Sequence, residues 1–181
     1  MRDRGLLELV EAVAPTSMTD VDAVFMGSGP EATRLRGAID GLAARSRMHL
    51  LPPVPPAELL DWVASADVGV MVNQPRTLNE QLSTPNKLFE CLTAGTPVVS
   101  SDFPERRRIV LGGEDGPLGR VCDPTNPAEI AMAIRAILDL APSDATALRA
   151  RCREAGRVRY GWEAQVMRAL AAYADITERS W

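Results

Sequence analysis

The stretch that decides the fold is residues 84–100, which reads TPNKLFECLTAGTPVVS. Pro85 stands where helices often start, apolar residues follow it at helical spacing, and Gly95 stands where helices often end. The run from Thr96 to Ser100 is rich in β-branched residues and predicts a strand directly after the helix. A loop, a helix and a strand in this order are typical of an α/β sheet whose helix N-terminus cradles a phosphate.

Lys87, in the first turn of this helix, is the single lysine of a chain that carries 19 arginines. A lysine kept against that background suggests a position where a guanidinium group cannot serve. The amides of Asn86, Lys87 and Leu88 lack partners within the helix, and the helix dipole there favours an anion. Glu90 lies on the same face, where its carboxylate could accept both hydroxyl protons of a ribose. Spacing alone leaves a second interpretation open, an ordinary surface ion pair between Lys87 and Glu90.

Length and composition bound the function. The chain has 181 residues, 46% of them hydrophobic and 24% charged, which predicts one globular domain over residues 1–181. A net charge of −4 and a pI near 5.1 argue against a nucleic-acid partner. Three cysteines without a CxxC pair indicate reduced thiols in a cytoplasmic protein, and one histidine without a carboxylate cluster argues against a metal site. The sequence contains neither a run of 18 apolar residues nor an apolar leader behind Met1.

Helix and strand signals alternate along the chain. Strands are expected near 21–26, 48–51, 67–72, 97–100 and 118–122. Helices are expected near 6–13, 31–44, 57–65, 87–94, 104–110, 127–140 and 144–159, followed by a C-terminal helix within 161–178, and residues 73–84 are expected to form a polar loop. This alternation predicts an α/β fold, a Rossmann-like parallel sheet with helices on both faces. Ligands of such sheets bind at the carboxyl ends of the strands, where this chain carries residues 27–29, 52–54, 73–84 and 101–102.

Three further patterns have competing interpretations. The stretch 27–32 matches the GxGxxA dinucleotide fingerprint, but the next strand runs into Pro52 and Pro53 and does not end in the acidic residue that would hold a ribose. A tight strand-to-helix turn that can still touch a ligand is the simpler interpretation. The run 106–108 consists of arginines and is interpreted as a solvated helix face, whereas Asp102 either binds a sugar hydroxyl or caps the helix that follows.

Taken together, the chain resembles the C-terminal, donor-binding domain of the GT-B glycosyltransferases in the large retaining family 4. The resemblance covers essentially the whole chain and lies in the order and spacing of five stretches: RGLLELVEA at 4–12, FMGSGP at 25–30, PVPPAEL at 53–59 with ADVGV at 66–70, PNKLFECLTAGTPVVS at 85–100, and GRVCDPTNPAEIAMAI at 119–134. It implies the C-terminal half of a GT-B enzyme and a nucleotide-diphosphate sugar as donor substrate.

The resemblance also implies roles by position. Lys87, together with Asn86 and Leu88, falls at the helix start that binds the diphosphate. Arg4 falls where the family has a basic residue that faces the diphosphate, and Glu90 falls on the second glutamate of a paired motif that binds the ribose. The remaining donor positions lie in two turns, one of the glycine-rich type and one beside the base: Gly27, Gly29, Pro53 and Val54.

The chain departs from the family pattern in two respects. Leu82 replaces the first glutamate of the paired motif, which leaves the sugar contact unassigned, and Glu80 is nearby but out of register. The family normally has an acceptor-binding domain before this one, so the chain is interpreted as the donor half of a larger enzyme. The last helix, between Trp162 and Trp181, would reach back onto that absent domain. Contact with the inner face of a membrane would be made through the absent domain.

The predicted function is therefore retaining transfer of a sugar from a nucleotide-diphosphate donor, without a metal or another cofactor. Lys87 and Arg4 would stabilise the charge on the leaving diphosphate. The chain alone is expected to bind the donor weakly and to transfer nothing. Two alternatives stay open: a non-catalytic module that binds a nucleotide sugar, which Leu82 favours, and a NAD-binding oxidoreductase domain, which the stretch 27–32 suggests.

Overall fold

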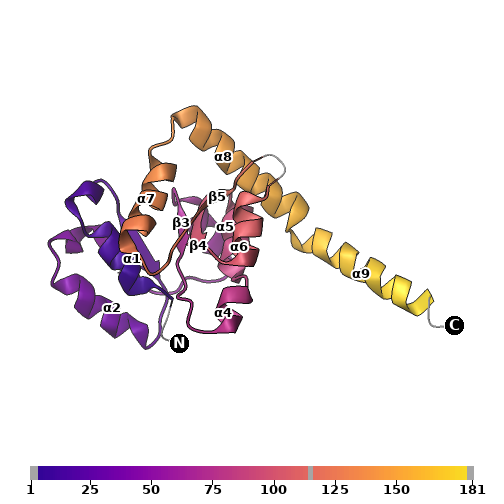
Figure 1. Cartoon of the computed structure of the whole chain (residues 1–181), viewed down its shortest axis with the longest axis horizontal. Coiled ribbons are helices and arrows are strands. Elements are labelled where there is room, and N and C mark those ends of the chain that lie inside the picture. Colours follow the sequence, from indigo (N-terminus) through magenta and orange to yellow (C-terminus); the bar gives the residue numbers. More distant parts are fainter. Residues whose placement is uncertain (1–3, 114–115, 179–181) are drawn as a thin grey trace.

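The computed structural model describes residues 4–113 and 116–178 and has an α/β architecture (Figure 1). Its strands are β1 (Ala23–Met26), β2 (Met48–Leu51), β3 (Gly69–Met71), β4 (Val98–Ser101) and β5 (Gly119–Cys122). Every pairing between them is parallel, which confirms the predicted class. Within the described residues the strands form two ladders, β1–β2 and β3–β4–β5, where the sequence suggested one continuous sheet.

The helices connect and cover these strands. They are α1 (Leu6–Val13), α2 (Glu31–Asp40), α3 (Leu59–Ala64), α4 (Leu78–Leu82), α5 (Asn86–Ala94), α6 (Pro104–Leu111), α7 (Pro127–Leu138), α8 (Pro142–Glu154) and α9 (Trp162–Glu178). Helix α5 packs on β3 and β4 and against α3 and α8, whereas α7 packs on β4 and β5 and against α1. All four residues of β4 are buried, so this central strand is covered on both faces, as the sequence predicts for a parallel sheet.

Most predicted elements are present, with shifted ends. Asn126 caps α7, because its side-chain oxygen accepts hydrogen bonds from the amides of Ala128 (3.1 Å) and Glu129 (3.4 Å). Helix α2 ends at Asp40, several residues earlier than predicted, and Gly41, a weak helix former, follows it. The prediction of a loop throughout 73–84 is wrong, because α4 occupies part of that stretch.

The arginine run on α6 does not behave as one solvated face. Arg107 and Arg108 are exposed, but Arg106 is only 1% exposed, so the prediction is wrong for that residue. Arg106 precedes Ile109 and Val110 by three and four positions, and both of these are buried. Positions at this spacing share one face of a helix, and the fold turns that face inward.

Helix α9 extends away from the rest of the molecule, at the end opposite to α1 and α2 (Figure 1). Several of its large apolar side chains are exposed, among them Trp162, Met167, Leu170, Tyr173 and Ile176. The helix is present as predicted, whereas Trp181 lies outside the described residues. Among the described residues, no helix is both long enough and apolar enough to cross a bilayer.

Candidate functional site

The start of α5 is the centre of the candidate site. Pro85 has an extended backbone and stands directly before the first helical residue, and Gly95 ends the helix in a left-handed conformation with φ of 75°. Leu88 and Leu92 are completely buried and fix the helix on the core. The sequence therefore determines both ends of α5 and the face it buries, which places its N-terminus at the carboxyl edge of the parallel strands.

Two of the three amides predicted to meet a phosphate remain available. Pro85 makes no side-chain cap for the helix, and the first amides of a helix have no acceptor within it. The amide of Leu88, however, donates to the carbonyl oxygen of Pro85 at 3.0 Å, and its side chain is buried. The amide of Leu88 therefore already has an acceptor in this structure, and the amides of Asn86 and Lys87 are better placed to meet an anion; the role of all three stays a prediction.

Lys87 is a cation in an unusual setting. Partial burial lowers the pKa of Lys87, and the nearby charge of Arg4 lowers it further, while Glu90 acts in the opposite direction. Within the described residues, no hydrogen bond or ion pair joins the Lys87 ammonium to Glu90 or to another side chain. The interpretation of Lys87 and Glu90 as an ordinary surface ion pair is therefore wrong for this structure.

Arg4 reaches the same place from the other end of the chain. Gly5 stands before α1 with φ of 69°, a conformation that glycine adopts far more readily than other residues. A Cβ atom at Gly5 would lie 1.9 Å from the carbonyl oxygen of Val72, the residue directly after β3. This contact fixes the start of α1 at the carboxyl end of β3 and brings Arg4 close enough to Lys87 to influence its pKa. A second positive charge, distant in sequence, thus acts at the start of α5.

The other predicted donor residues lie in the turns that follow β1 and β2. The amide of Gly27 donates to the carbonyl oxygen of Leu51 at 3.0 Å, so the turn after β1 lies beside the end of β2. Gly27 and Gly29 have φ of 141° and 146°, are exposed, and face open space where side chains would stand. Further on, Pro53 is exposed and Val54 is half-buried. These residues line one edge of the ladder, and their contact with a donor stays a prediction.

The residues near the missing glutamate have their own partners. Glu80 takes part in the cap of α4, where its amide and its carboxylate each lie 3.2 Å from the hydroxyl of Thr77. Leu82 is 54% exposed. Asp102 does not cap α6 as predicted, because both of its carboxylate oxygens accept hydrogen bonds from Arg107.

Three polar residues at this edge could not be assigned from the sequence. The side-chain amide of Gln74 donates to the carbonyl oxygens of Val72 (3.2 Å) and Pro124 (2.7 Å), and joins the chain after β3 to the loop after β5. The hydroxyl of Ser101 donates to the carbonyl oxygen of Asn73 at 2.8 Å. Arg106 is the third. Gln74 and Ser101 donate to backbone carbonyls, and Arg106 donates to two carbonyls and to two side chains distant in sequence, so no residue pattern in the sequence reveals these contacts.

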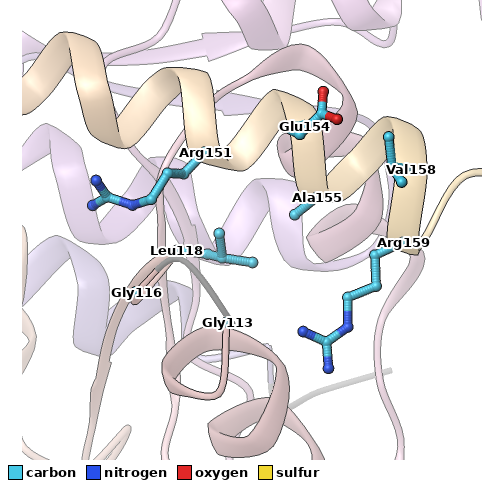
Figure 2. A pocket seen from close by; sticks show the side chains of 8 residues that line it. All are labelled: Gly113, Gly116, Leu118, Arg151, Glu154, Ala155, Val158 and Arg159. Atoms are coloured by element: carbon cyan, nitrogen blue, oxygen red, sulfur yellow. The ribbon is translucent and has the colours of Figure 1, made fainter.

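The described surface also has a pocket of about 190 Å³ between α8, the wide turn after it (Ala155–Arg159) and the loop before β5 (Figure 2). It is lined by Gly113, Gly116, Leu118, Arg151, Glu154, Ala155, Val158 and Arg159. Leu118 directly precedes β5, so this pocket lies at the amino edge of the sheet, opposite the start of α5. Among the described residues no three His, Cys, Asp or Glu side chains gather in a way that could hold a metal ion.

Comparison with known proteins identifies the family. The model of the family described as glycosyl transferases group 1 matches residues 1–140 of the chain. The chain belongs to the glycosyl transferases group 1 family. A phosphatidyl-myo-inositol mannosyltransferase of Mycobacterium tuberculosis is 30% identical to this group 1 chain over 178 residues, which are 96% of the chain and 44% of that protein. A D-inositol 3-phosphate glycosyltransferase of Geodermatophilus obscurus is 33% identical over 153 residues, 84% of the chain and 31% of that protein.

Solved structures confirm the fold of this group 1 chain. Sucrose-phosphate synthase of Thermosynechococcus elongatus superposes with a TM-score of 0.78 at 23% identity, over 99% of this chain and 44% of that one. HepE of Anabaena, solved in complex with UDP-glucose, superposes with a TM-score of 0.71 at 18% identity, over 95% of this chain and 46% of that one. The group 1 chain therefore has the architecture of one half of a GT-B glycosyltransferase, and it spans less than half the length of these relatives.

Proposed function

We propose that this chain is the donor-binding part of a glycosyltransferase and that it binds a nucleotide-diphosphate sugar at the N-terminus of α5. The observation that carries the proposal is the start of α5, whose first amides have no acceptor in the helix, with Lys87 in its first turn and the charge of Arg4 near enough to act on Lys87. Positive charge beside amides at a helix N-terminus attracts an anion such as a diphosphate. Family membership and the UDP-glucose complex of Anabaena HepE support a nucleotide-diphosphate sugar as that anion.

In the proposed complex the diphosphate accepts hydrogen bonds from the amides of Asn86 and Lys87 and lies beside the side chains of Lys87 and Arg4. Glu90, half-buried one turn into α5, accepts hydrogen bonds from the ribose hydroxyl groups. The turn at Gly27 and Gly29 approaches the donor closely, because neither residue carries a side chain. Pro53 and Val54 form the surface beside the base.

The proposed reaction is retaining and independent of a metal ion. As the bond between the sugar and the diphosphate breaks, negative charge grows on the leaving phosphate oxygens, and Lys87, Arg4 and the helix dipole stabilise it. No residue of the chain is assigned as a nucleophile. The departing phosphate itself accepts the proton of the acceptor hydroxyl as the new glycosidic bond forms. Transfer belongs to the whole protein, since the relatives of this chain are more than twice its length.

Calorimetric titration with UDP-glucose, GDP-glucose and ADP-glucose tests the proposal, because these donors share one sugar and differ only in the base. We expect one of them to bind. We also expect Glu90→Ala to weaken that binding by about 10-fold or more, since hydrogen bonds that involve a charged group contribute about 1.5–3 kcal/mol. Glu105→Ala serves as the matched control, because Glu105 is half-buried like Glu90 and lies near a helix start outside the site, and it should leave the affinity unchanged.

A full-length protein that binds none of the three donors would count against the proposal, and an unchanged affinity in Glu90→Ala would remove the ribose role. A non-catalytic nucleotide-sugar module is the second candidate, and the replacement of a family glutamate by Leu82 favours it. Donor binding by a full-length protein that transfers to no acceptor and hydrolyses no donor would support that candidate. The family match does not favour the NAD-binding alternative.

A further inference from the structure

Arg106, in α6, is the charged side chain that the fold buries most fully within the described residues. Its Nε donates to the carbonyl oxygen of Ser83 and its Nη2 to that of Glu80, both at 3.3 Å. Its Nη1 donates to the side-chain oxygens of Asn73 (3.2 Å) and Ser101 (3.3 Å). One guanidinium group thus bonds three separate segments: the end of β3, the end of α4 and the end of β4.

Arg106 keeps its charge despite the cost of burial, because the pKa of a guanidinium is very high. Desolvation lowers the pKa of Arg106, and the charge of Glu80 opposes that shift. The guanidinium carbon lies 4.9 Å from the centre of the Phe103 ring, a distance typical of a cation–π contact. An arginine stays protonated in such a site and presents its donors in a fixed planar fork, which a lysine cannot reproduce.

The segment that Arg106 holds buries none of the α4 side chains in the core. Helix α4 has five residues, none of them buried, and Leu78 is 69% exposed. A helix of this length is not stable without tertiary contacts. The Thr77 cap and the bond from Gln81 to the carbonyl oxygen of Pro75 (3.1 Å) tie the segment only to itself. Arg106 satisfies two carbonyl groups at the end of α4, where a helix leaves its last acceptors without partners.

The same bonds set the start of α5. Ser83 lies two residues before Pro85 and three before Asn86, so a fixed Ser83 carbonyl fixes the path of the chain into the first turn of α5. We propose that Arg106 is a positioning residue for the nucleotide-sugar site: through Ser83 and Glu80 it holds the amides of Asn86 and Lys87 where the diphosphate needs them. This inference rests on the proposed function of the α5 N-terminus. Arg106 itself does not touch the donor.

Two measurements on the same variants test the inference. Hydrogen exchange is measured on the chain without ligand, and donor affinity is measured by calorimetry with UDP-glucose, GDP-glucose and ADP-glucose. The variants are Arg106→Met, which keeps the length of the side chain without its donors, and Arg106→Lys, which keeps the charge without the fork. Asn73→Ala removes one acceptor and leaves Arg106 in place. Arg108→Met is the control, because Arg108 is exposed on the same helix and pairs with Glu105 at 2.8 Å.

We expect Arg106→Met to speed amide exchange within residues 78–88 and to weaken donor binding on the order of 10-fold or more, in line with the loss of several hydrogen bonds from a charged group. Arg106→Lys should restore part of both properties. All measurements are made well below the thermal midpoint of each variant. Exchange in α7 and β5 should stay as in the unaltered chain, which separates local positioning from general loss of stability. Arg108→Met should change neither property.

The outcomes distinguish this inference from the proposed function. An unaltered chain that binds no nucleotide sugar would overturn the proposed function, and the inference would fall with it. Donor binding that is equal in the unaltered chain and in Arg106→Met would overturn the inference alone. Should Arg106→Met fail to fold, Asn73→Ala and Arg106→Lys decide the matter: unchanged exchange and unchanged affinity in both would overturn the inference.

Discussion

At the scale of single residues, the chemistry of the site depends on Lys87. Its lowered pKa has the sign expected when a cation is partly removed from water and placed near a second cation. A bound diphosphate would act in the opposite direction, because its negative charge favours the protonated ammonium. Attraction between the Lys87 ammonium and the negative diphosphate is the physical basis of the affinity that we propose.

The lowered pKa of Lys87 has a consequence for pH. The ammonium of Lys87 loses its proton at a lower pH than an ordinary lysine, whose pKa is about 10.4. Because only the protonated form attracts the diphosphate, donor affinity should fall as the pH rises from neutral towards that value. Lys87→Arg, which stays protonated throughout this range, should show no such fall. Calorimetry at several pH values measures the difference, and parallel curves for the two proteins would contradict the assignment.

Residue types and spacing were sufficient to single out Lys87 and Glu90 as candidate site residues. They did not decide whether the two side chains form an ion pair. The sequence left a surface ion pair as an open interpretation, and only the three-dimensional environment removes it. Leu88 was assigned to the phosphate site from its position, yet its side chain completes the core and its amide is bonded to Pro85. Arg106 could not be found at all, since its acceptors are mostly backbone carbonyls and side chains distant in the sequence.

At the scale of elements, the strong signals were those in which several local preferences agree. Helix α5 has a proline before it, an apolar face and a glycine after it, and both of its ends were predicted closely. Helix α4 was missed although its start carries a recognisable signal: Thr77 and Glu80 have the spacing of a capping box. The polar composition of 73–84 outweighed that signal, because α4 buries no apolar side chain that would reveal a helical period.

The contact between the start of α1 and the end of β3 gives a prediction at this scale. Gly5→Ala should destabilise the chain by at least about 1–2 kcal/mol, the cost of a left-handed backbone for a residue with a Cβ, and the collision with Val72 adds to it. Gly37→Ala is the matched control: Gly37 lies within α2 with open space around it, so alanine should stabilise by about 0.5–1 kcal/mol. Urea unfolding measures both, and a neutral Gly5→Ala would contradict the close contact.

At the scale of the whole molecule, the alternation of helices and strands correctly predicted the fold class, and it placed the candidate site at the carboxyl edge of the strands. The division into two ladders was not predicted, because pairing between strands depends on packing that no short sequence window contains. Arginine side chains hold several loops to the body of the molecule by bonds to carbonyl groups. Arg149, for example, donates to the carbonyl oxygens of Ala64 (2.6 Å) and Ala66 (2.8 Å). The richness in arginine thus serves the fold as well as the surface.

The described part of the molecule has two basic regions, which lie at opposite edges of the strands. Lys87 and Arg4 lie at the carboxyl edge of the strands, whereas Arg151 and Arg159 line the pocket at the amino edge (Figure 2). Both could attract an anion by charge alone. Only the carboxyl edge combines cations with helix amides that lack acceptors, which is why we assign the donor to it.

The most direct test of this assignment is a crystal structure of the chain with the nucleotide sugar that binds best. The expected result places diphosphate oxygens within hydrogen-bonding distance of the amides of Asn86 and Lys87 and of the Lys87 ammonium, with the ribose hydroxyls on Glu90. A diphosphate bound instead beside Arg151 and Arg159, with the start of α5 left unbound, would contradict the account.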